Sequence, residues 1–318
     1  MKASAAFALA MLITATASAQ SYPARPLRMI VPFPAGGGSD AVGRIIGQKL
    51  TERFGQQVVV DNRAGAGGSV GTEAAVRATP DGYNMVLAST SEIAINPALY
   101  KLGYDTLKDL APVALVASAA MVVVVPPSAG LDSVKDLVAL AKAKPGALNV
   151  ASAGNGTITH LSGELFRSLA GLNWTHVPYK GAPPALTDVA GGRVQVMFSS
   201  LPAAMPLIKS GRVKAIAVST RGRQPSLPDV PTVVESGVAA YEVVYWYGVF
   251  VPAATPIAIM TRLAGEIEQS LQQKDVILNL ANQGALPGSS TQAQFAQFVQ
   301  AEHARWTKLV KSSGAKSD

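Results

Sequence analysis

The sequence predicts two α/β lobes with a ligand cleft between them, and three observations carry this prediction. Strand-like and helix-like segments alternate over the first 90 residues, which is typical of βαβ units around a parallel sheet. The same order of elements returns after residue 121. The chain has 318 residues, enough for two domains, and its 48% apolar content is enough for a sizeable core.

The first lobe is expected to begin with a strand at 27–33 ("LRMIVPF"), followed by a helix at 39–55. In that helix Val42, Ile45, Ile46 and Leu50 recur at helical spacing, and Ser39 or Asp40 can cap its start. A short buried strand at 56–62, a helix at 68–78 after a glycine loop, and a third strand at 83–89 complete the unit.

The second lobe repeats this order from a strand at 121–128 ("MVVVVPPS") and a helix at 131–146. A strand that ends in "SAGNGTITH" (152–160), the segments "NWTHVPYKG" and "VQVMFSS", and the helices between them follow the pattern of the first lobe. The chain then continues with a strand-like run at 241–256 and helical segments at 256–284 and 291–313, which we expect to pack on the first lobe. We therefore assign residues 20–121 and 246–318 to lobe 1, and residues 122–245 to lobe 2.

Residues 1–19 are typical of a secretory signal peptide. Lys2 precedes an apolar stretch from Ala5 to Ile13, and the small residues "ASA" follow, which predicts cleavage after Ala19. The apolar stretch is shorter than the roughly 20 residues that a membrane anchor needs. The chain has no cysteine, so disulfides, thiolate zinc sites and a cysteine nucleophile are excluded. We expect a mature protein in the periplasm.

The charge of the chain favours small anions as partners. The formal net charge is +7, from 27 basic and 20 acidic residues, and no run of Lys or Arg appears. Nucleic-acid binding would require a basic stripe or stacking aromatics, and aromatics make up only 6% of the chain. A modest, dispersed positive charge fits the attraction of small anions better.

Two glycine loops stand between a strand and a helix, at matching places in the two lobes. They are the first glycine loop, "PAGGGSD" (34–40), and the second glycine loop, "SAGNGT" (152–157). A helix N-terminus has free N–H groups and a partial positive charge, and glycine lets the backbone approach a ligand closely. One such loop alone is as well explained by turn and cap chemistry. Two matching loops favour an anion, most simply a carboxylate, held between the lobes.

The sequence offers little for nucleotide binding or catalysis. The first glycine loop lacks the Gly-Lys-Ser/Thr of a P-loop, and "GAGGSVG" (65–71) misplaces the third glycine of the dinucleotide fingerprint. The three histidines, His160, His176 and His303, form no metal-binding motif. His160 could hydrogen-bond near a ligand or could be a packed polar helix residue. We therefore expect binding without catalysis, and no metal or cofactor.

Polar loop ends complete the candidate site. "STSE" (89–92) and "SSLP" (199–202) follow the third strands of the two lobes, where hydroxyls would face the cleft, although turn chemistry would also explain them. "YWYG" (245–248) is compatible with a hinge, a core or a pocket wall, and core packing is the simplest interpretation of Trp246.

Longer stretches of the chain, from about residue 26 to beyond 290, are distinctive. They include "VPFPAGGGSDAVGRIIGQKL", "VVVDNRAGAGGSVGTEAAVRATPDGYNMVLAS", "NPALY", "APVALVA", "HVPYKGAPPALTDVAGGRVQVMF", "PDVPTVVESG" and "WYGVFVPAATP". In these stretches the chain resembles the Bug-type, or TctC-type, extracytoplasmic solute-binding receptors of tripartite tricarboxylate transporters.

The resemblance implies a periplasmic binding protein-like fold (type II), closure on a small carboxylate, and delivery to integral-membrane transporter subunits. It implies a monomer without enzymatic activity; the alternative is a ligand-sensing receptor of a two-component signalling system. Many relatives carry an acidic residue where this chain has Ser199, so a di- or tricarboxylate or an aromatic carboxylate is favoured over an amino acid. The expected ligand-binding residues are Phe33, Ala35, Gly36, Gly37, Gly38, Asp40, Ser89, Thr90, Ser91, Ser152, Ala153, Asn155, Gly156, Thr157, His160, Tyr179, Ser199 and Ser200.

Overall fold

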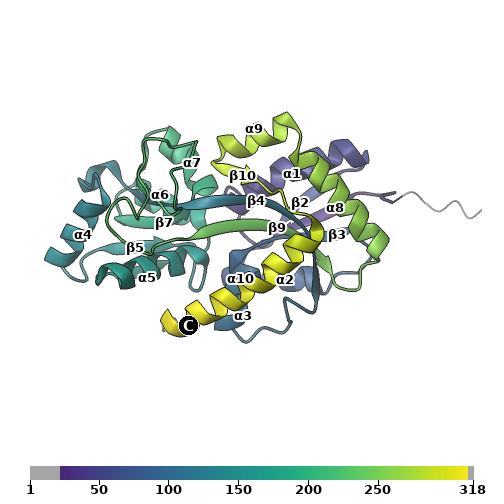
Figure 1. Cartoon of the computed structure of the whole chain (residues 1–318), viewed down its shortest axis with the longest axis horizontal. Helices are drawn as coiled ribbons and strands as arrows, with labels where there is room; N and C mark the ends of the chain where they lie inside the picture. Colours follow the sequence, from purple (N-terminus) through teal and green to yellow (C-terminus); the bar gives the residue numbers. More distant parts are fainter. Residues whose placement is uncertain (1–21, 314–318) are drawn as a thin grey trace, which may run out of the picture.

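The computed structural model describes residues 22–313 and shows two α/β halves side by side (Figure 1). The predicted signal peptide lies outside the described residues. Two long strands, β4 (Leu110–Val125) and β9 (Val244–Pro252), connect the halves. The strand order across the whole sheet is β2-β1-β3-β9-β4-β7-β5-β6, and β8 and β10 also pair with β4. The predicted two-lobed α/β fold is confirmed.

The first half is built on the parallel strands β1 (Leu27–Val31), β2 (Val58–Asn62) and β3 (Asn84–Ser89). Its two crossover helices are α1 (Gly38–Phe54) and α2 (Ser69–Val76). The shorter elements of this half are η1 (Ala66–Gly68), the π-helical turn η2 (Ser91–Ile95) and α3 (Asn96–Leu99).

The second half repeats the parallel arrangement, since β5 pairs in parallel with both β6 and β7. Its strands are β5 (Asn149–Ser152), β6 (Thr175–Pro178), β7 (Val196–Ser200) and β8 (Lys214–Val218). Its helices are η3 (Pro127–Ala129), α4 (Val134–Ala143), α5 (Ile158–Ala170), α6 (Ala182–Ala190) and α7 (Leu201–Lys209).

Strand β4 belongs to both halves. It pairs with β9 from Leu110 to Ala120, and from Met121 onward it pairs with β7 and β8. The strand expected from the sequence covers only 121–128, whereas β4 begins eleven residues earlier, at Leu110. Most of its residues are buried on both faces, so the segment lacks the alternation of polar and apolar residues that marks a half-exposed strand.

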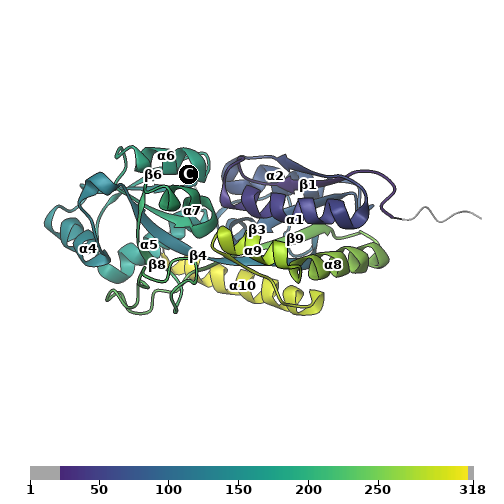
Figure 2. The same cartoon turned by 90° about the horizontal axis from the view of Figure 1, so that it is seen from above.

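The C-terminal elements are α8 (Ile257–Leu271), α9 (Lys274–Asn282), β10 (Ala285–Pro287) and α10 (Gln292–Ser313). The expected helical segment at 256–284 is thus two helices. As expected, α8 and α9 pack on the first half, where both contact α1. Helix α10 runs below the connecting strands and also reaches α5 of the second half (Figure 2). Within residues 22–313, no helix combines the length and the apolarity that crossing a membrane requires.

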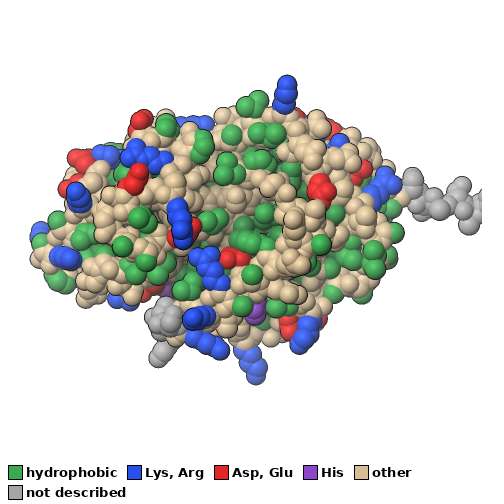
Figure 3. All heavy atoms as spheres, in the orientation of Figure 1, with side chains coloured by type: hydrophobic (Ala, Val, Ile, Leu, Met, Phe, Trp, Pro, Cys, Tyr) green, Lys and Arg blue, Asp and Glu red, His purple; other side chains and the backbone are tan. Residues whose placement is uncertain are grey.

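Charged side chains are dispersed over the surface. On the face in Figure 3, Lys and Arg side chains lie singly or in small groups, with Asp and Glu among them. Most of the ion pairs are at least partly exposed, and exposed pairs of this kind each contribute little to stability.

An aromatic cluster fixes β9 against α10. Trp246 is 1% exposed and packs edge-on against Phe295, with ring centroids 6.0 Å apart. Gly248, on the same face of β9, leaves room for the Phe295 ring: a Cβ at this position would overlap Cζ and would lie 3.0 Å from Cε1 of that ring.

We expect Gly248→Ala to lower the free energy of unfolding by about 1–3 kcal/mol, because it overpacks this cluster. Gly265→Ala is the matched control. Gly265 lies inside α8 with no atom within 4 Å of its virtual Cβ, so alanine there should raise stability by about 0.5–1 kcal/mol. Urea unfolding of both variants measures the difference. Equal effects would contradict the close packing of β9 on α10.

Candidate functional site

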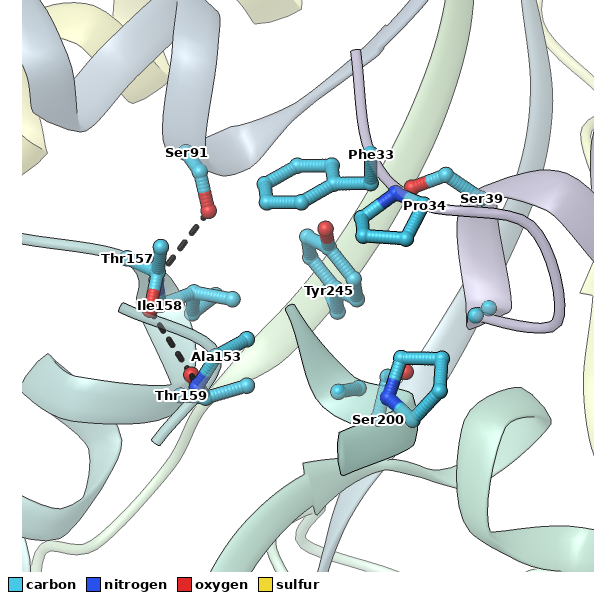
Figure 4. Close-up of a pocket in the computed structure, with 14 residues that line it drawn as sticks. Phe33, Pro34, Ser39, Ser91, Ala153, Thr157, Ile158, Thr159, Ser200 and Tyr245 are labelled. Atoms are coloured by element: carbon cyan, nitrogen blue, oxygen red, sulfur yellow. Dashed lines mark hydrogen bonds between the residues drawn. The ribbon is translucent and has the colours of Figure 1, made fainter. Parts of the chain in front are cut away.

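A small cavity lies between the two halves, where the first and second glycine loops face each other (Figure 4). Its volume is about 30 Å³, far below the roughly 300–1,000 Å³ of typical ligand pockets. Its walls come from the first glycine loop, the start of α5, the end of β7, the start of α6 and Tyr245 of β9. The halves therefore meet closely in this structure.

The first glycine loop leads from β1 into α1. Gly36 has φ 79°, in the left-handed region that favours glycine, and Gly37 is the N-cap with extended backbone and no side-chain cap. The helix begins at Gly38, so the expectation that Ser39 or Asp40 caps it is wrong. Both residues lie within the first turn, where helix geometry leaves N–H groups without an intrahelical acceptor.

Asp40 braces this loop from inside the helix. Its Oδ2 accepts a hydrogen bond of 2.9 Å from the Gly36 amide and one of 3.0 Å from Nε of Arg44. Burial raises the pKa of Asp40, but the hydrogen bonds from Arg44 and Gly36 outweigh burial and hold the pKa below its usual value. Asp40 does not line the cavity, so its part in the site is to fix the loop.

Gly38 allows the start of α1 to approach the second half. A Cβ at Gly38 would lie 2.6 Å from Oγ of Ser200 and 2.8 Å from the hydroxyl of Tyr247. Because real Cβ contacts are essentially never this short, a side chain here would force Ser200 of the second half and Tyr247 of the first half to move.

The second glycine loop leads from β5 into α5 with a similar geometry. Thr157 is the N-cap with extended backbone, and its hydroxyl donates to the Gly154 carbonyl at 2.7 Å. The Ala153 amide donates to Oγ1 of Thr159 at 2.8 Å. Gly156 has φ 69°, and a Cβ there would lie 2.7 Å from Leu99 of the first half.

Two histidines support the second glycine loop from behind. The ring of His160 stacks on that of His176, with centroids 3.9 Å apart. The Gly156 amide donates to Nδ1 of His160 at 3.2 Å, and Nε2 of His176 lies 2.7 Å from Oγ of Ser152. Neither ring lines the cavity, so His160 orders the loop and does not form part of the cavity wall.

Two hydrogen bonds cross the cleft near the second glycine loop. The Ile158 amide, in the first turn of α5, donates to Oγ of Ser91 at 3.0 Å (Figure 4). The Tyr100 hydroxyl donates to the Asn155 carbonyl at 2.8 Å. Both bonds join the first half to the second, so the structure is a closed form in which Ser91 supplies an acceptor to an N–H at the start of α5.

The cavity holds no charged side chain among its lining residues. Its polar groups are the hydroxyls of Ser39, Ser91, Thr157, Thr159, Ser200 and Tyr245 and the backbone at two helix starts. Helix N-termini and hydroxyls can hold an anion by hydrogen bonds. None of the lining residues has a side chain that would serve as a base near neutral pH.

The structure brings part of the predicted set together at the cavity. Seven expected residues line it: Phe33, Gly37, Gly38, Ser91, Ala153, Thr157 and Ser200. Tyr179 lies beside it and lines an adjoining pocket of about 350 Å³ that shares Phe33, Pro34 and Ala153 and includes the glycine-rich residues 64–68 and Lys180. The other expected residues line neither pocket: Ala35, Gly36, Asp40, Ser89, Thr90, Ser152, Asn155, Gly156, His160 and Ser199.

Seven lining residues were missed: Pro34, Ser39, Ile158, Thr159, Ala182, Pro183 and Tyr245. Tyr245 is the most informative, because its ring stands in the middle of the wall (Figure 4). The spacing of Tyr245 and Tyr247 puts both on one face of β9, opposite Trp246. That alternation within "YWYG" was the available signal.

A family model and several solved structures match this chain over most of its length. The model of the tripartite tricarboxylate transporter family receptor (TctC) matches residues 42–315. The structure is similar to Rpa4515 of R. palustris with adipate (35% identity, 93% of this chain and 99% of that chain, TM-score 0.90). It is similar to MatC (Rpa3494) from Rhodopseudomonas palustris with bound malate (32% identity, 91% of this chain and 100% of that chain, TM-score 0.86). It is also similar to the periplasmic binding protein BugD (33% identity, 93% of this chain and 100% of that chain, TM-score 0.89).

The fold and the site thus define a two-lobed solute-binding protein of the periplasmic binding class, and not an enzyme. Within that class the chain belongs to the TctC family, the receptors of tripartite tricarboxylate transporters. The family predicted from the sequence is confirmed.

We expect Asp40→Asn to lower the free energy of unfolding by about 1–2 kcal/mol at pH 7, because charge-assisted hydrogen bonds to Arg44 and Gly36 are weakened. The pKa of Asp40 is lower in the folded state than in the unfolded chain. Its contribution is therefore present above about pH 4 and is lost as the pH falls through the folded value. Urea unfolding between pH 7 and pH 3 should show the two proteins converging at low pH.

Glu73→Gln is the matched control, since Glu73 and Arg77 form an acid–arginine pair at the same spacing but with both side chains exposed. Its cost should stay below about 0.5 kcal/mol. If both substitutions cost the same, Asp40 does not brace the first glycine loop.

Proposed function

We propose that this protein captures a small carboxylate between its lobes and delivers it, by closure, to the membrane subunits of a tripartite tricarboxylate-type transporter. The observation that carries this proposal is the facing of two helix N-termini, those of α1 and α5, across one cavity with no charged side chain in its wall. Each terminus offers N–H donors and a partial positive charge to an anion. Of the similar structures, Rpa4515 is with adipate and MatC has bound malate.

The lining favours a di- or tricarboxylate, or an aromatic carboxylate, over an amino acid. An ammonium group would require an acidic partner, and Ser199 and Ser200 are neutral hydroxyls at the end of β7. The Ser199 hydroxyl donates to the Ser200 carbonyl at 3.2 Å, so it is held away from a ligand. The adjoining pocket, which includes Lys180, provides room for the remainder of a longer acid.

Ligand capture requires opening and closure of the two lobes. The closed cavity of about 30 Å³ is too small to admit such a ligand without movement. A ligand that bonds both helix starts has more contacts in the closed state and therefore favours it. We assign residues 20–121 and 246–318 to one lobe and residues 122–245 to the other, with movement at the two connecting strands. We further propose a periplasmic monomer whose signal peptide is cleaved after Ala19.

A carboxylate panel tests the ligand class. We expect the melting temperature of the mature protein to rise by several degrees with at least one of succinate, malate, adipate, citrate and benzoate, because a ligand at 100 times its Kd stabilises the native state by about 2.7 kcal/mol. The corresponding amides serve as uncharged controls. A flat response to all the acids would overturn the carboxylate assignment.

A Gly38→Val variant tests closure. The valine side chain would meet Ser200 of the second half only when the lobes close, whereas its contact with Tyr247 of the first half persists when they open. The affinity for a binding acid should therefore fall at least tenfold, about 1.4 kcal/mol. Isothermal calorimetry measures Kd, and Gly265→Ala, inside α8 and away from the cleft, should leave it unchanged. An unchanged Kd in Gly38→Val would show that binding does not need this contact.

A further inference from the structure

A fully buried carboxyl group, that of Glu92, lies one layer behind the cavity wall. Glu92 is in the first turn of η2 and is 0% exposed. Its Oε2 accepts hydrogen bonds from the Ser89 amide, at 3.2 Å, and from the Ser89 hydroxyl, whereas Oε1 has no hydrogen-bond partner. Burial raises the pKa of Glu92 to about 7, and the bonds from Ser89 offset only part of this rise.

The fold makes room for this side chain. A Cβ at Gly68 would lie 2.6 Å from Cγ and 3.1 Å from Cδ of Glu92. Gly68 also has φ 95°, a conformation that side chains rarely adopt. The absence of a side chain at Gly68 therefore leaves the space that the Glu92 side chain occupies.

No cation is hydrogen-bonded to Glu92 among the described residues. The elements packed against η2 are η1, β3, α3 and α10, and β9 contributes the Tyr245 hydroxyl beyond Ser89. The groups whose pKa is raised in part by the charge of Glu92 are Tyr104, Tyr245 and Tyr247. Helix α10 also carries Glu302, His303, Arg305, Lys308 and Lys311, and the segment after α3 carries Tyr100, Lys101, Asp105, Lys108 and Asp109. Glu302 is itself bonded to Arg305 and to the indole N–H groups of Trp246 and Trp306.

Ser89 links Glu92 to the cavity. Its Oγ hydrogen-bonds to Glu92 and lies 2.8 Å from the hydroxyl of Tyr245, which lines the cavity together with Ser39 and Ser91. Glu92, Ser89 and Tyr245 thus form a chain of three hydrogen-bonding groups that runs from a buried carboxyl to the ligand space.

The charge of Glu92 decides which way this chain can point, because each hydroxyl has a single hydrogen. When Glu92 is ionised, it holds the Ser89 proton, so Ser89 can only accept from Tyr245. With its proton on Ser89, the Tyr245 oxygen presents lone pairs to Ser39, to Ser91 and to the cavity. When Glu92 is protonated, it donates to Ser89, Ser89 donates to Tyr245, and Tyr245 can donate its proton to a ligand carboxylate.

We propose that binding of a carboxylate in this cavity is coupled to uptake of one proton by Glu92, with Ser89 and Tyr245 as the relay and Tyr245 as a residue that selects for an anion. The inference rests on the proposed carboxylate ligand. The proton comes from solvent and converts the Glu92 carboxylate to the acid, so that no covalent bond of the ligand changes. A second anion beside a buried carboxylate without a cation is strongly disfavoured, which gives the coupling its direction.

Calorimetry of wild type with adipate, malate and citrate, at pH 7.5 in HEPES and in Tris, measures the protons taken up per ligand. We expect an uptake approaching one proton at pH 7.5 and near zero at pH 6, and an affinity that falls about tenfold between pH 6.5 and 8.5. Glu92→Gln should show no uptake and a flat pH profile, because a glutamine side chain does not titrate. Tyr245→Phe should bind more weakly and lose most of the pH dependence.

Tyr104→Phe is the matched control, since Tyr104 lies close enough to Glu92 to have its pKa raised by it but is outside the relay; it should behave as wild type. If Glu92→Gln fails to fold, the comparison of Tyr245→Phe with Tyr104→Phe still tests the relay. Binding without proton uptake in wild type, or uptake unchanged in Glu92→Gln, would overturn this inference and leave the proposed function intact. No heat with any of the three acids would overturn both.

Discussion

The arrangement of the molecule depends on one shared strand. Because β4 pairs with β9 as far as Ala120 and with β7 and β8 from Met121 onward, a single stretch of backbone belongs to both halves. The halves can therefore turn relative to one another only through small changes along β4 and β9. The same pairing brings the carboxyl ends of β1, β5 and β7 to one cleft, and it puts Tyr245 of β9 in the wall between them. The site is a consequence of this connection.

An anion site without cations makes particular demands on the backbone. A lysine or arginine would bind an anion from many positions, but N–H groups at a helix start act only over a short distance and in one direction. The loops must consequently be rigid and must approach closely. Asp40 holds the Gly36 amide, His160 holds the Gly156 amide, and Gly38 removes the side chain that would separate the halves. The polar groups around the cavity thus serve mainly to fix backbone, which explains why many expected residues do not line it.

The features of the fold and the site that the sequence predicts are those set by residues close together in the chain. The two glycine loops and the order of elements are local patterns, and they predicted the two-lobed fold and seven lining residues. The start of α1 was misplaced by one residue because Asp40 reaches back to Gly36 from the first turn instead of capping the helix. The alternation of Tyr245 and Trp246 indicates that they face opposite sides of β9, but which side meets the cavity depends on how β9 crosses between the halves. The extent of β4 was hidden because burial on both faces removes the alternation that a strand pattern needs.

In the closed form, a hydroxyl of the protein occupies an N–H donor that a bound anion could take over. Ser91 accepts the Ile158 N–H at the start of α5, which is the same donor that an anion would require. A neutral hydroxyl is a weaker acceptor than a carboxylate, so a ligand can replace it with a gain in free energy. Because the closed state satisfies its own N–H donors, the free energy of closing without ligand is lower. The apparent affinity for ligand then falls in proportion to the fraction of molecules that are open and able to bind. In the proposed site, the Ser91 hydroxyl therefore acts as an internal substitute for the anion.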